Sequence, residues 1–195
     1  MKAVIFIFLV FSASIFSQDV KFLGEDITFR LNKENFIVDG LYWFINETDK
    51  PIEKIIYYPF PVDDSTGEVH SISIYNISEQ RDEIAMEICN NGLRYLLMMP
   101  ANDTTIYRIG YRQSVRNGCA KYILTSTAEW NEPLEWAKYK LIADDKTEIN
   151  KFSYEPDKLY QVDKEKIFYW ERRNFLPEFD FVICIKKNEC LRLSK

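Results

Sequence analysis

An alternation of apolar and polar residues with a period of two constrains the fold of this chain more than any other feature. It runs through residues 72–74, 84–88, 137–141 and 179–185. Successive side chains of a β-strand point to opposite faces, so this period is typical of strands that bury one face. No segment keeps the 3.6-residue period of an amphipathic helix. The pattern therefore predicts strands, with at most one helical turn near residues 128–131.

Turn residues separate these strands and suggest how they are connected. Asn-Gly at residues 117–118, and clusters of Asn, Asp, Gly and Pro elsewhere, interrupt the apolar runs at intervals of roughly 10–20 residues. Residues 36–45 are apolar on both faces apart from Asp39 and Gly40, which favours a long central strand. Aromatic residues make up 15% of the chain, a composition that favours strands. We predict an all-β protein, an antiparallel β-sandwich with little or no helix.

The N-terminus has the composition of a secretory leader. Lys2 is followed by a 14-residue run of apolar and small residues that ends before Ser17. The run is short for a membrane span, although an uncleaved anchor is the alternative. We expect residues 1–17 to be a signal peptide cleaved near Ser17, and residues 18–195 to form one β-sandwich domain. The protein would then be secreted or periplasmic, with no transmembrane segment after leader removal.

The chain contains four cysteines, an even number that in an exported protein indicates disulfides. Cys184 and Cys190 flank five residues, a separation that a short loop can close. Cys89 and Cys119 both lie beside predicted turns. These positions favour the pairs 184–190 and 89–119, although four cysteines allow three pairings and reduced thiols are the alternative.

Charge and residue spacing argue against several classes of function. The chain carries 25 basic and 30 acidic residues, with no basic run, which argues against a nucleic-acid partner. The only histidine is His70, and no pair of cysteines has zinc-ligand spacing. The six glycines are scattered rather than gathered in a phosphate-binding loop. We therefore expect no metal site and no cofactor.

The segment EWNEPLEW, residues 129–136, is the strongest candidate for a binding site. Trp130 or Trp136 could stack on a sugar ring, and two of its acids, Glu129, Glu132 and Glu135, could form a glycosidase pair if held about 5–10 Å apart. Pro133 lies between them and cannot donate a ladder hydrogen bond. The favoured interpretation is a crossover between two strands, anchored by tryptophans.

Residues 36–76 resemble VIT domains (vault protein inter-alpha-trypsin). The shared pattern is Phe-x-Asn at 44–46, Ile-Glu at 52–53 and Tyr-Pro-Phe-Pro at 58–61, and residues 104–113 are similar to a later strand of the same domain. Apart from the resemblance, the side chain of Asn46 can tie its turn by hydrogen bonds.

The remainder is similar to uncharacterised exported bacterial β-sandwich domains, through residues 122–141. Together the two resemblances imply an all-β interaction or structural module with no catalytic residues to carry over. Asn-x-Ser/Thr glycosylation sequons occur at Asn46, Asn76 and Asn102, in or next to predicted turns.

The function predicted from the sequence is an exported, non-enzymatic binding or structural module. Its expected partner is a protein surface or an envelope polysaccharide. The alternative is a carbohydrate-binding module that uses Trp130 and Trp136 with Glu129 and Glu132. A glycoside hydrolase that uses Glu129, Glu132 or Glu135 is the third hypothesis.

Overall fold

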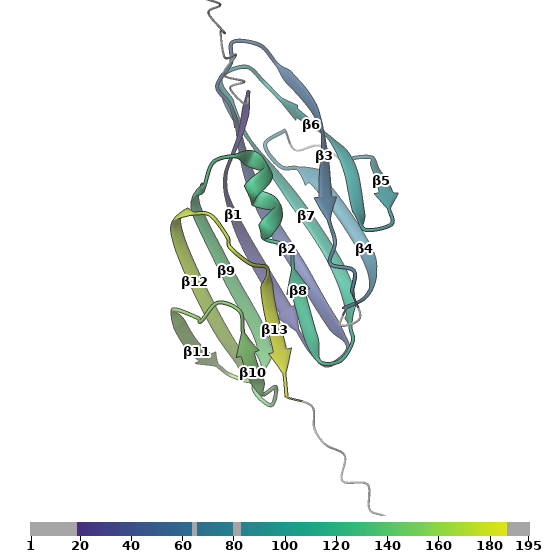
Figure 1. The fold of residues 1–195 in the computed structure, drawn as a ribbon, viewed down its shortest axis with the longest axis vertical. Helices are drawn as coiled ribbons and strands as arrows, with labels where there is room; N and C mark the ends of the chain where they lie inside the picture. The colour runs from purple at the N-terminus through teal and green to yellow at the C-terminus, as the bar shows by residue number, and fades with distance from the viewer. Residues whose placement is uncertain (1–18, 64–65, 80–82, 187–195) are drawn as a thin grey trace, which may run out of the picture.

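The computed structural model describes residues 19–63, 66–79 and 83–186. The predicted leader and Cys190 lie outside this part. Strands contain 67% of the described residues and helix 4%, which confirms the predicted all-β class (Figure 1). Its elements are β1 (Val20–Leu31), β2 (Asn35–Asn46), β3 (Ile52–Pro59), β4 (Thr66–Asn76), β5 (Met86–Cys89), β6 (Gly92–Met99), β7 (Asp103–Val115), β8 (Cys119–Tyr122), the 3-10 helix η1 (Thr125–Trp130), β9 (Leu134–Asp144), β10 (Ile149–Phe152), β11 (Lys158–Val162), β12 (Glu165–Phe175) and β13 (Phe181–Ile185).

One large sheet of seven strands forms the back of the molecule, in the order β11-β12-β9-β1-β2-β7-β4. The long strand predicted over residues 36–45 is β2, and it lies inside this sheet between β1 and β7. One pairing departs from the antiparallel prediction, because β9 runs parallel to β1. Parallel neighbours need a crossover connection. Here the connection is long: after β1 and before β9, the chain also contributes strands to both small sheets.

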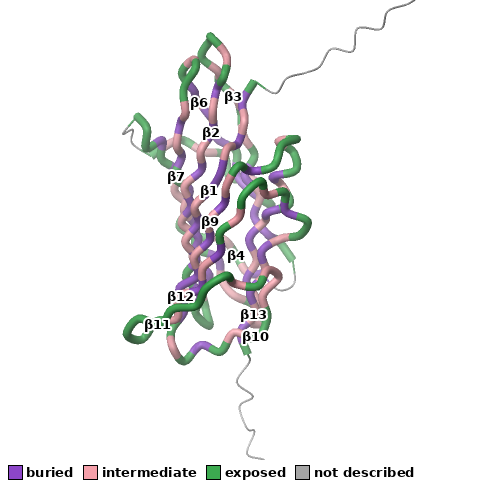
Figure 2. The backbone as a smooth tube through the Cα atoms, turned by 90° about the vertical axis from the view of Figure 1, so that its left-hand side faces the viewer, coloured by how far each residue is buried: buried purple, intermediate pink, exposed green. Residues whose placement is uncertain are grey.

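Two sheets of three strands, β10-β13-β8 and β3-β6-β5, cover the same face of the large sheet (Figure 1). Phe181 of β13 packs against Phe29 of β1 and Trp170 of β12. Tyr95 of β6 packs against Tyr107 of β7. The core lies between the layers, where the buried segments in Figure 2 run along the facing strands. The protein is therefore a sandwich whose second layer is split into two parts.

A β-bulge in β1 changes which side chains face the core. The register between β1 and β2 shifts between Phe22 and Gly24. Before the shift Phe22 points inward, and after it the inward set is Glu25, Ile27, Phe29 and Leu31. A Cβ at Gly24 would lie 2.5 Å from the carbonyl oxygen of Trp136 and 2.6 Å from its ring. Glycine thus lets β9 and the indole approach β1 closely, and the bulge turns the Glu25 carboxyl into the interior.

The disulfide links Cys119 of β8 to Cys184 of β13. The predicted pairs 89–119 and 184–190 are therefore wrong. The two cysteines lie opposite each other in the antiparallel register of β8 and β13, although 65 residues separate them. Cys89 is a free thiol at the end of β5. Nearness to turns misled the prediction, because it does not identify which strands become neighbours.

Asn46 ties the turn after β2, as the sequence predicted. Its Nδ2 donates to the carbonyls of Lys50 and Pro100, at 2.8 Å each. Its Oδ1 accepts from the backbone N–H and the hydroxyl of Thr48. The side chains of Asn46 and Asn76 are buried, whereas Asn102 is exposed. In the folded chain, Asn102 is the sequon whose amide faces solvent.

We expect Asn46→Ala to lower the free energy of unfolding by about 3 kcal/mol, because it leaves the Lys50 and Pro100 carbonyls without their buried donor. Asn90→Ala, in an exposed turn, is the control and should change it by less than about 0.5 kcal/mol. Urea unfolding followed by fluorescence gives both values. Equal effects for the two variants would show that the turn does not depend on the Asn46 side chain.

The double variant Cys119→Ser/Cys184→Ser should lose about 2–4 kcal/mol of unfolding free energy, because the bridge restricts a long loop of the unfolded chain. Cys89→Ser removes a free thiol and should change stability little. A peptide map without reductant should recover Cys119 and Cys184 in one cross-linked product. Recovery of either cysteine joined to Cys89 or Cys190 would contradict the pairing.

Candidate functional site

A cleft of about 260 Å³ lies where the two small sheets meet over the large sheet. β3 forms one wall, and η1 with the end of β8 forms the other, beside β3 in Figure 1. Residues from β1 and β2 lie beneath them. Its volume is close to the lower end of the range for small-molecule sites, about 300–1,000 Å³. Aromatic residues are the largest group in its lining: Phe22, Tyr42, Phe44, Tyr57, Tyr58, Tyr95, Tyr122 and Trp130.

The wall formed by η1 is held by polar contacts at its start and by an aromatic contact at its end. Asp180 Oδ1 accepts hydrogen bonds from the backbone N–H of Leu124 and from the N–H and hydroxyl of Thr125. Asn131 has a φ of 58° and ends the helix in the left-handed conformation. Trp130 packs against Phe22 and Phe44, with ring centroids 5.8 and 5.4 Å away. These contacts place the helix beside β3.

The floor of the cleft contains a buried carboxyl group, Glu25, which is 2% exposed. Tyr122 donates its hydroxyl hydrogen to Glu25 Oε2 at 2.9 Å, and Tyr139 donates to Oε1 at 2.5 Å. The Tyr42 hydroxyl lies 3.1 Å from that of Tyr122 and 2.8 Å from that of Tyr58. We call these five residues, Glu25, Tyr42, Tyr58, Tyr122 and Tyr139, the Glu25–tyrosine network.

When Glu25 is ionised, the hydrogen bonds among the tyrosines can be donated in only one direction. Each tyrosine has one hydrogen to donate, and Tyr122 gives its hydrogen to Glu25. Tyr42 must therefore donate to Tyr122, and Tyr58 to Tyr42. Gly40 leaves room for the Tyr42 hydroxyl in this chain, because a Cβ at residue 40 would lie 2.5 Å from that hydroxyl. The bonds from Tyr58, Tyr42 and Tyr122 all donate toward Glu25 Oε2, and Tyr139 donates to the other oxygen, Oε1.

Burial controls the ionisation of the network. Desolvation raises the pKa of Glu25 from 4.5 to about 7, while the hydrogen bonds from Tyr139 and Tyr122 partly oppose that rise. Burial also raises the pKa values of Tyr42, Tyr58, Tyr122 and Tyr139 well above the ordinary tyrosine value. The tyrosines therefore stay neutral at physiological pH, and Glu25 is the group whose charge changes near neutrality.

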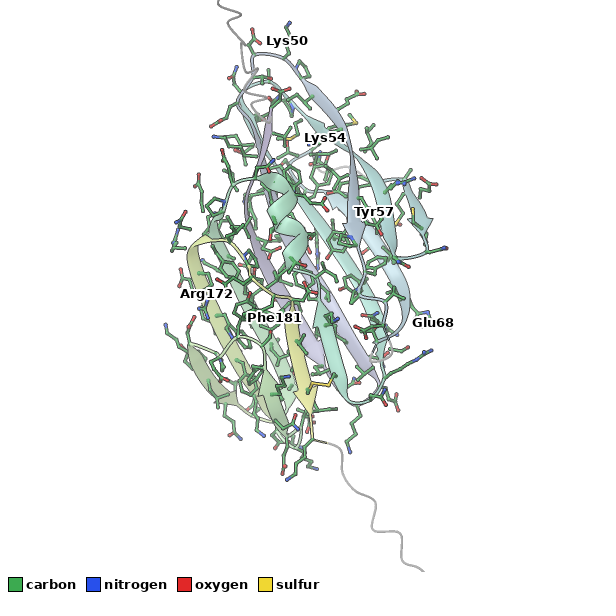
Figure 3. The ribbon with its side chains drawn as sticks, viewed as in Figure 1. Lys50, Lys54, Tyr57, Glu68, Arg172 and Phe181 are labelled. Atoms are coloured by element: carbon green, nitrogen blue, oxygen red, sulfur yellow. A yellow bond between two sulfur atoms is a disulfide. The ribbon has the colours of Figure 1, made fainter. Side chains whose placement is uncertain are left out.

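The mouth of the cleft carries a positive charge on an aromatic ring. The Lys54 Nζ of β3 lies over the Trp130 ring, 5.1 Å from its centroid. Lys54 and Tyr57 both lie on β3, with two residues between them (Figure 3). Glu129, exposed on η1, also lines the cleft. These side chains are more exposed than Glu25, which is buried.

The structure separates the two tryptophans that the sequence suggested as a sugar platform. Trp130 packs on the inner face of the large sheet and lines the cleft. Ala137 of β9 is buried, so its neighbour Trp136 points to the outer face of the large sheet. There its ring meets that of Trp43 edge to face, with ring centroids 4.6 Å apart. Trp130 and Trp136 therefore form no common surface. As predicted, the segment between them is a crossover, from β8 of a small sheet to β9 of the large one.

The three glutamates of this segment are also dispersed. Glu129 lines the cleft, Glu132 lies 3.9 Å from Lys21 of β1, and Glu135 is exposed at the start of β9. All three are exposed. Of the proposed site residues Trp130, Trp136, Glu129 and Glu132, the structure brings Trp130 and Glu129 together in the cleft.

Sequence reasoning missed Glu25 and its tyrosines. One signal was present: Glu25 is in phase with Ile27, Phe29 and Leu31, so an acid occupies a position of the apolar face of a strand. A carboxylate in that phase predicts a buried charge. No local pattern links it to Tyr122 or Tyr139, which follow it by 97 and 114 residues.

Comparison with known proteins shows the fold but no family. No family model and no curated protein matches the chain. A solved structure of a proposed nutrient binding protein from Legionella pneumophila is similar, with a TM-score of 0.60 and 13% identity over 86% of this chain and 67% of that one. An M1 zinc metallopeptidase from Deinococcus radiodurans is similar with a TM-score of 0.53 and 8% identity, over 85% of this chain and 42% of that one.

At these identities the likeness concerns the fold alone. The chain spans about two thirds of the Legionella protein and less than half of the peptidase. In the described part of this chain, no cluster of three or more His, Cys, Asp or Glu side chains could hold a metal ion. Nor does any helix among the described residues have the length and apolar character to cross a membrane. The resemblance to VIT domains stays a prediction.

Glu25 should make stability depend on pH in a way that Glu25→Gln removes. The raised pKa means that the folded state resists ionisation, so its contribution to stability is full below pH 4.5 and is lost as pH rises through 7. We expect the unfolding free energy of Glu25→Gln, relative to the wild type, to increase by about 3 kcal/mol from pH 4 to pH 8. Urea unfolding across this range measures the difference, and a constant difference would refute the buried-charge interpretation.

Proposed function

We propose that this protein is an exported, non-enzymatic binding module that holds a small molecule in the cleft between β3 and η1. The observation that carries the proposal is the composition of the cleft: aromatic walls, a few polar groups at the floor, and charged groups at the mouth. Small-molecule sites have this composition, since apolar walls provide affinity and placed polar groups provide orientation.

The arrangement of the floor favours binding over turnover. Both oxygens of Glu25 accept tyrosine hydroxyls, and among the described residues Tyr122 and Tyr139 are its hydrogen-bond partners. The carboxyl is thus held rather than paired with a second acid or base. The name of the Legionella protein, which refers to nutrient binding, agrees with a binding role. The separation of Trp130 from Trp136 gives no support to the sugar platform.

Export is proposed from the leader and supported by the disulfide. A bond such as Cys119–Cys184 persists in oxidising compartments, which include the periplasm and the extracellular space. We propose that residues 1–17 are removed near Ser17 and that the module acts there. A second protein or an envelope polysaccharide would receive or present the small molecule.

A phenylalanine at Ser126 should block the cleft, because Ser126 lines it from η1. Ala128→Phe is the matched control, since Ala128 is exposed on the same helix and is not part of the cleft lining. The measurement is ligand-observed NMR with benzyl alcohol, benzylamine, phenol and cyclohexanol as probes. We expect at least one probe to bind the wild type and Ala128→Phe, and to lose at least tenfold in affinity for Ser126→Phe.

Two results would overturn the proposed site. Either none of the four probes binds the wild type, or every probe that binds does so equally well to Ser126→Phe and Ala128→Phe. Circular dichroism of both variants establishes that they fold before the probes are compared.

A further inference from the structure

The buried carboxyl of Glu25 lacks a positive partner within the described residues. The ion pairs found there, such as Lys21–Glu47 and Arg172–Asp157, join side chains with substantial exposure, and none involves Glu25. Lys54 lines the same cleft, but its ammonium group lies over Trp130 at the mouth. A charged group removed from water without a counterion is costly. The floor of the cleft thus has an uncompensated preference for a cation.

The walls above Glu25 have the same preference. Phe22, Tyr42, Phe44, Tyr58 and Tyr95 line the cleft with Trp130. The face of an aromatic ring carries partial negative charge and attracts cations, most strongly where water is excluded. A carboxylate and several aromatic rings around one small volume form the kind of site that recognises organic ammonium ions.

We propose that the cleft binds a small organic ammonium ion, whose nitrogen lies against Glu25 and whose apolar body is enclosed by the aromatic walls. This rests on the proposed function, because it names the ligand class for the same cleft. The Lys54 ammonium at the mouth disfavours a second positive charge at the outer end of the ligand. The ligand is therefore a monocation whose outer end is neutral or anionic.

The ionisation of Glu25 also predicts how pH acts on binding. The titratable side chains that contact Glu25 or continue its hydrogen bonds are Tyr122, Tyr139, Tyr42 and Tyr58, from four different strands. Burial keeps all four neutral near pH 7. An ammonium ion pairs with the ionised form of Glu25, so protonation of Glu25 competes with binding. Affinity should fall about tenfold for each pH unit below the Glu25 pKa of about 7.

The test compares benzylamine, which is protonated at pH 8, with the neutral and nearly isosteric benzyl alcohol. Calorimetric or NMR titration of the mature wild-type chain at pH 8 should give a benzylamine affinity at least tenfold above that of benzyl alcohol. At pH 5.5 benzylamine should bind about 30-fold more weakly, while benzyl alcohol should change by less than twofold. Glu25→Gln should bind both probes alike at both pH values.

Different outcomes reject different claims. If benzyl alcohol binds as tightly as benzylamine and Ser126→Phe abolishes both, the cleft is a site for neutral molecules and the ammonium proposal is wrong. If benzylamine binding survives in Ser126→Phe, the cation binds elsewhere and the proposed cleft fails as well. The comparison of probes and of pH in the wild type requires no variant, so the proposal is decided even if Glu25→Gln does not fold.

Discussion

The buried carboxyl of Glu25 is the constraint on which the arrangement of the three sheets depends. It accepts from Tyr122 of β8 and Tyr139 of β9, and through Tyr42 the same chain of hydroxyls reaches Tyr58 of β3. One hydrogen-bonded network thus joins the large sheet to both small sheets. Apolar contacts fix how closely the layers pack but impose little direction. The network adds directional bonds at the seam between the small sheets, where the cleft interrupts the apolar packing.

The network exists because of a local irregularity in β1. In an unbroken strand, residues in phase with Phe22 would continue to face the core and Glu25 would face outward. The bulge between Phe22 and Gly24 shifts that phase by one residue. Gly24 then accepts the close approach of Trp136 on the outer face, while the neighbouring carboxyl enters the interior. One glycine therefore serves the packing of β9 outside and the polar floor of the cleft inside.

Local sequence patterns predicted the features that neighbouring residues determine, namely strand faces and turns. The alternation in residues 137–141 marks the buried face of β9, and the side chain of Asn46 ties its turn. The same kind of pattern was misleading for Ile88, which is 68% exposed at the short edge strand β5. Pairings between distant strands were beyond local reasoning: Cys119 with Cys184, β1 with β9, and Glu25 with its tyrosines. Each depends on which strands become neighbours, and residue spacing does not encode that.

The free-energy cost of burying the Glu25 carboxylate helps to decide whether the network serves stability or binding. A buried carboxyl with a pKa raised to about 7 opposes folding at neutral pH, and an apolar residue in its place would remove that opposition. Buried polar networks can also select one packing among several, which is a structural role. Such a role works equally well when the network is fully enclosed by the core. Here the carboxyl borders an open cleft lined by aromatic rings. A group that opposes folding and borders a cleft of this kind is consistent with the ligand recognition that we propose.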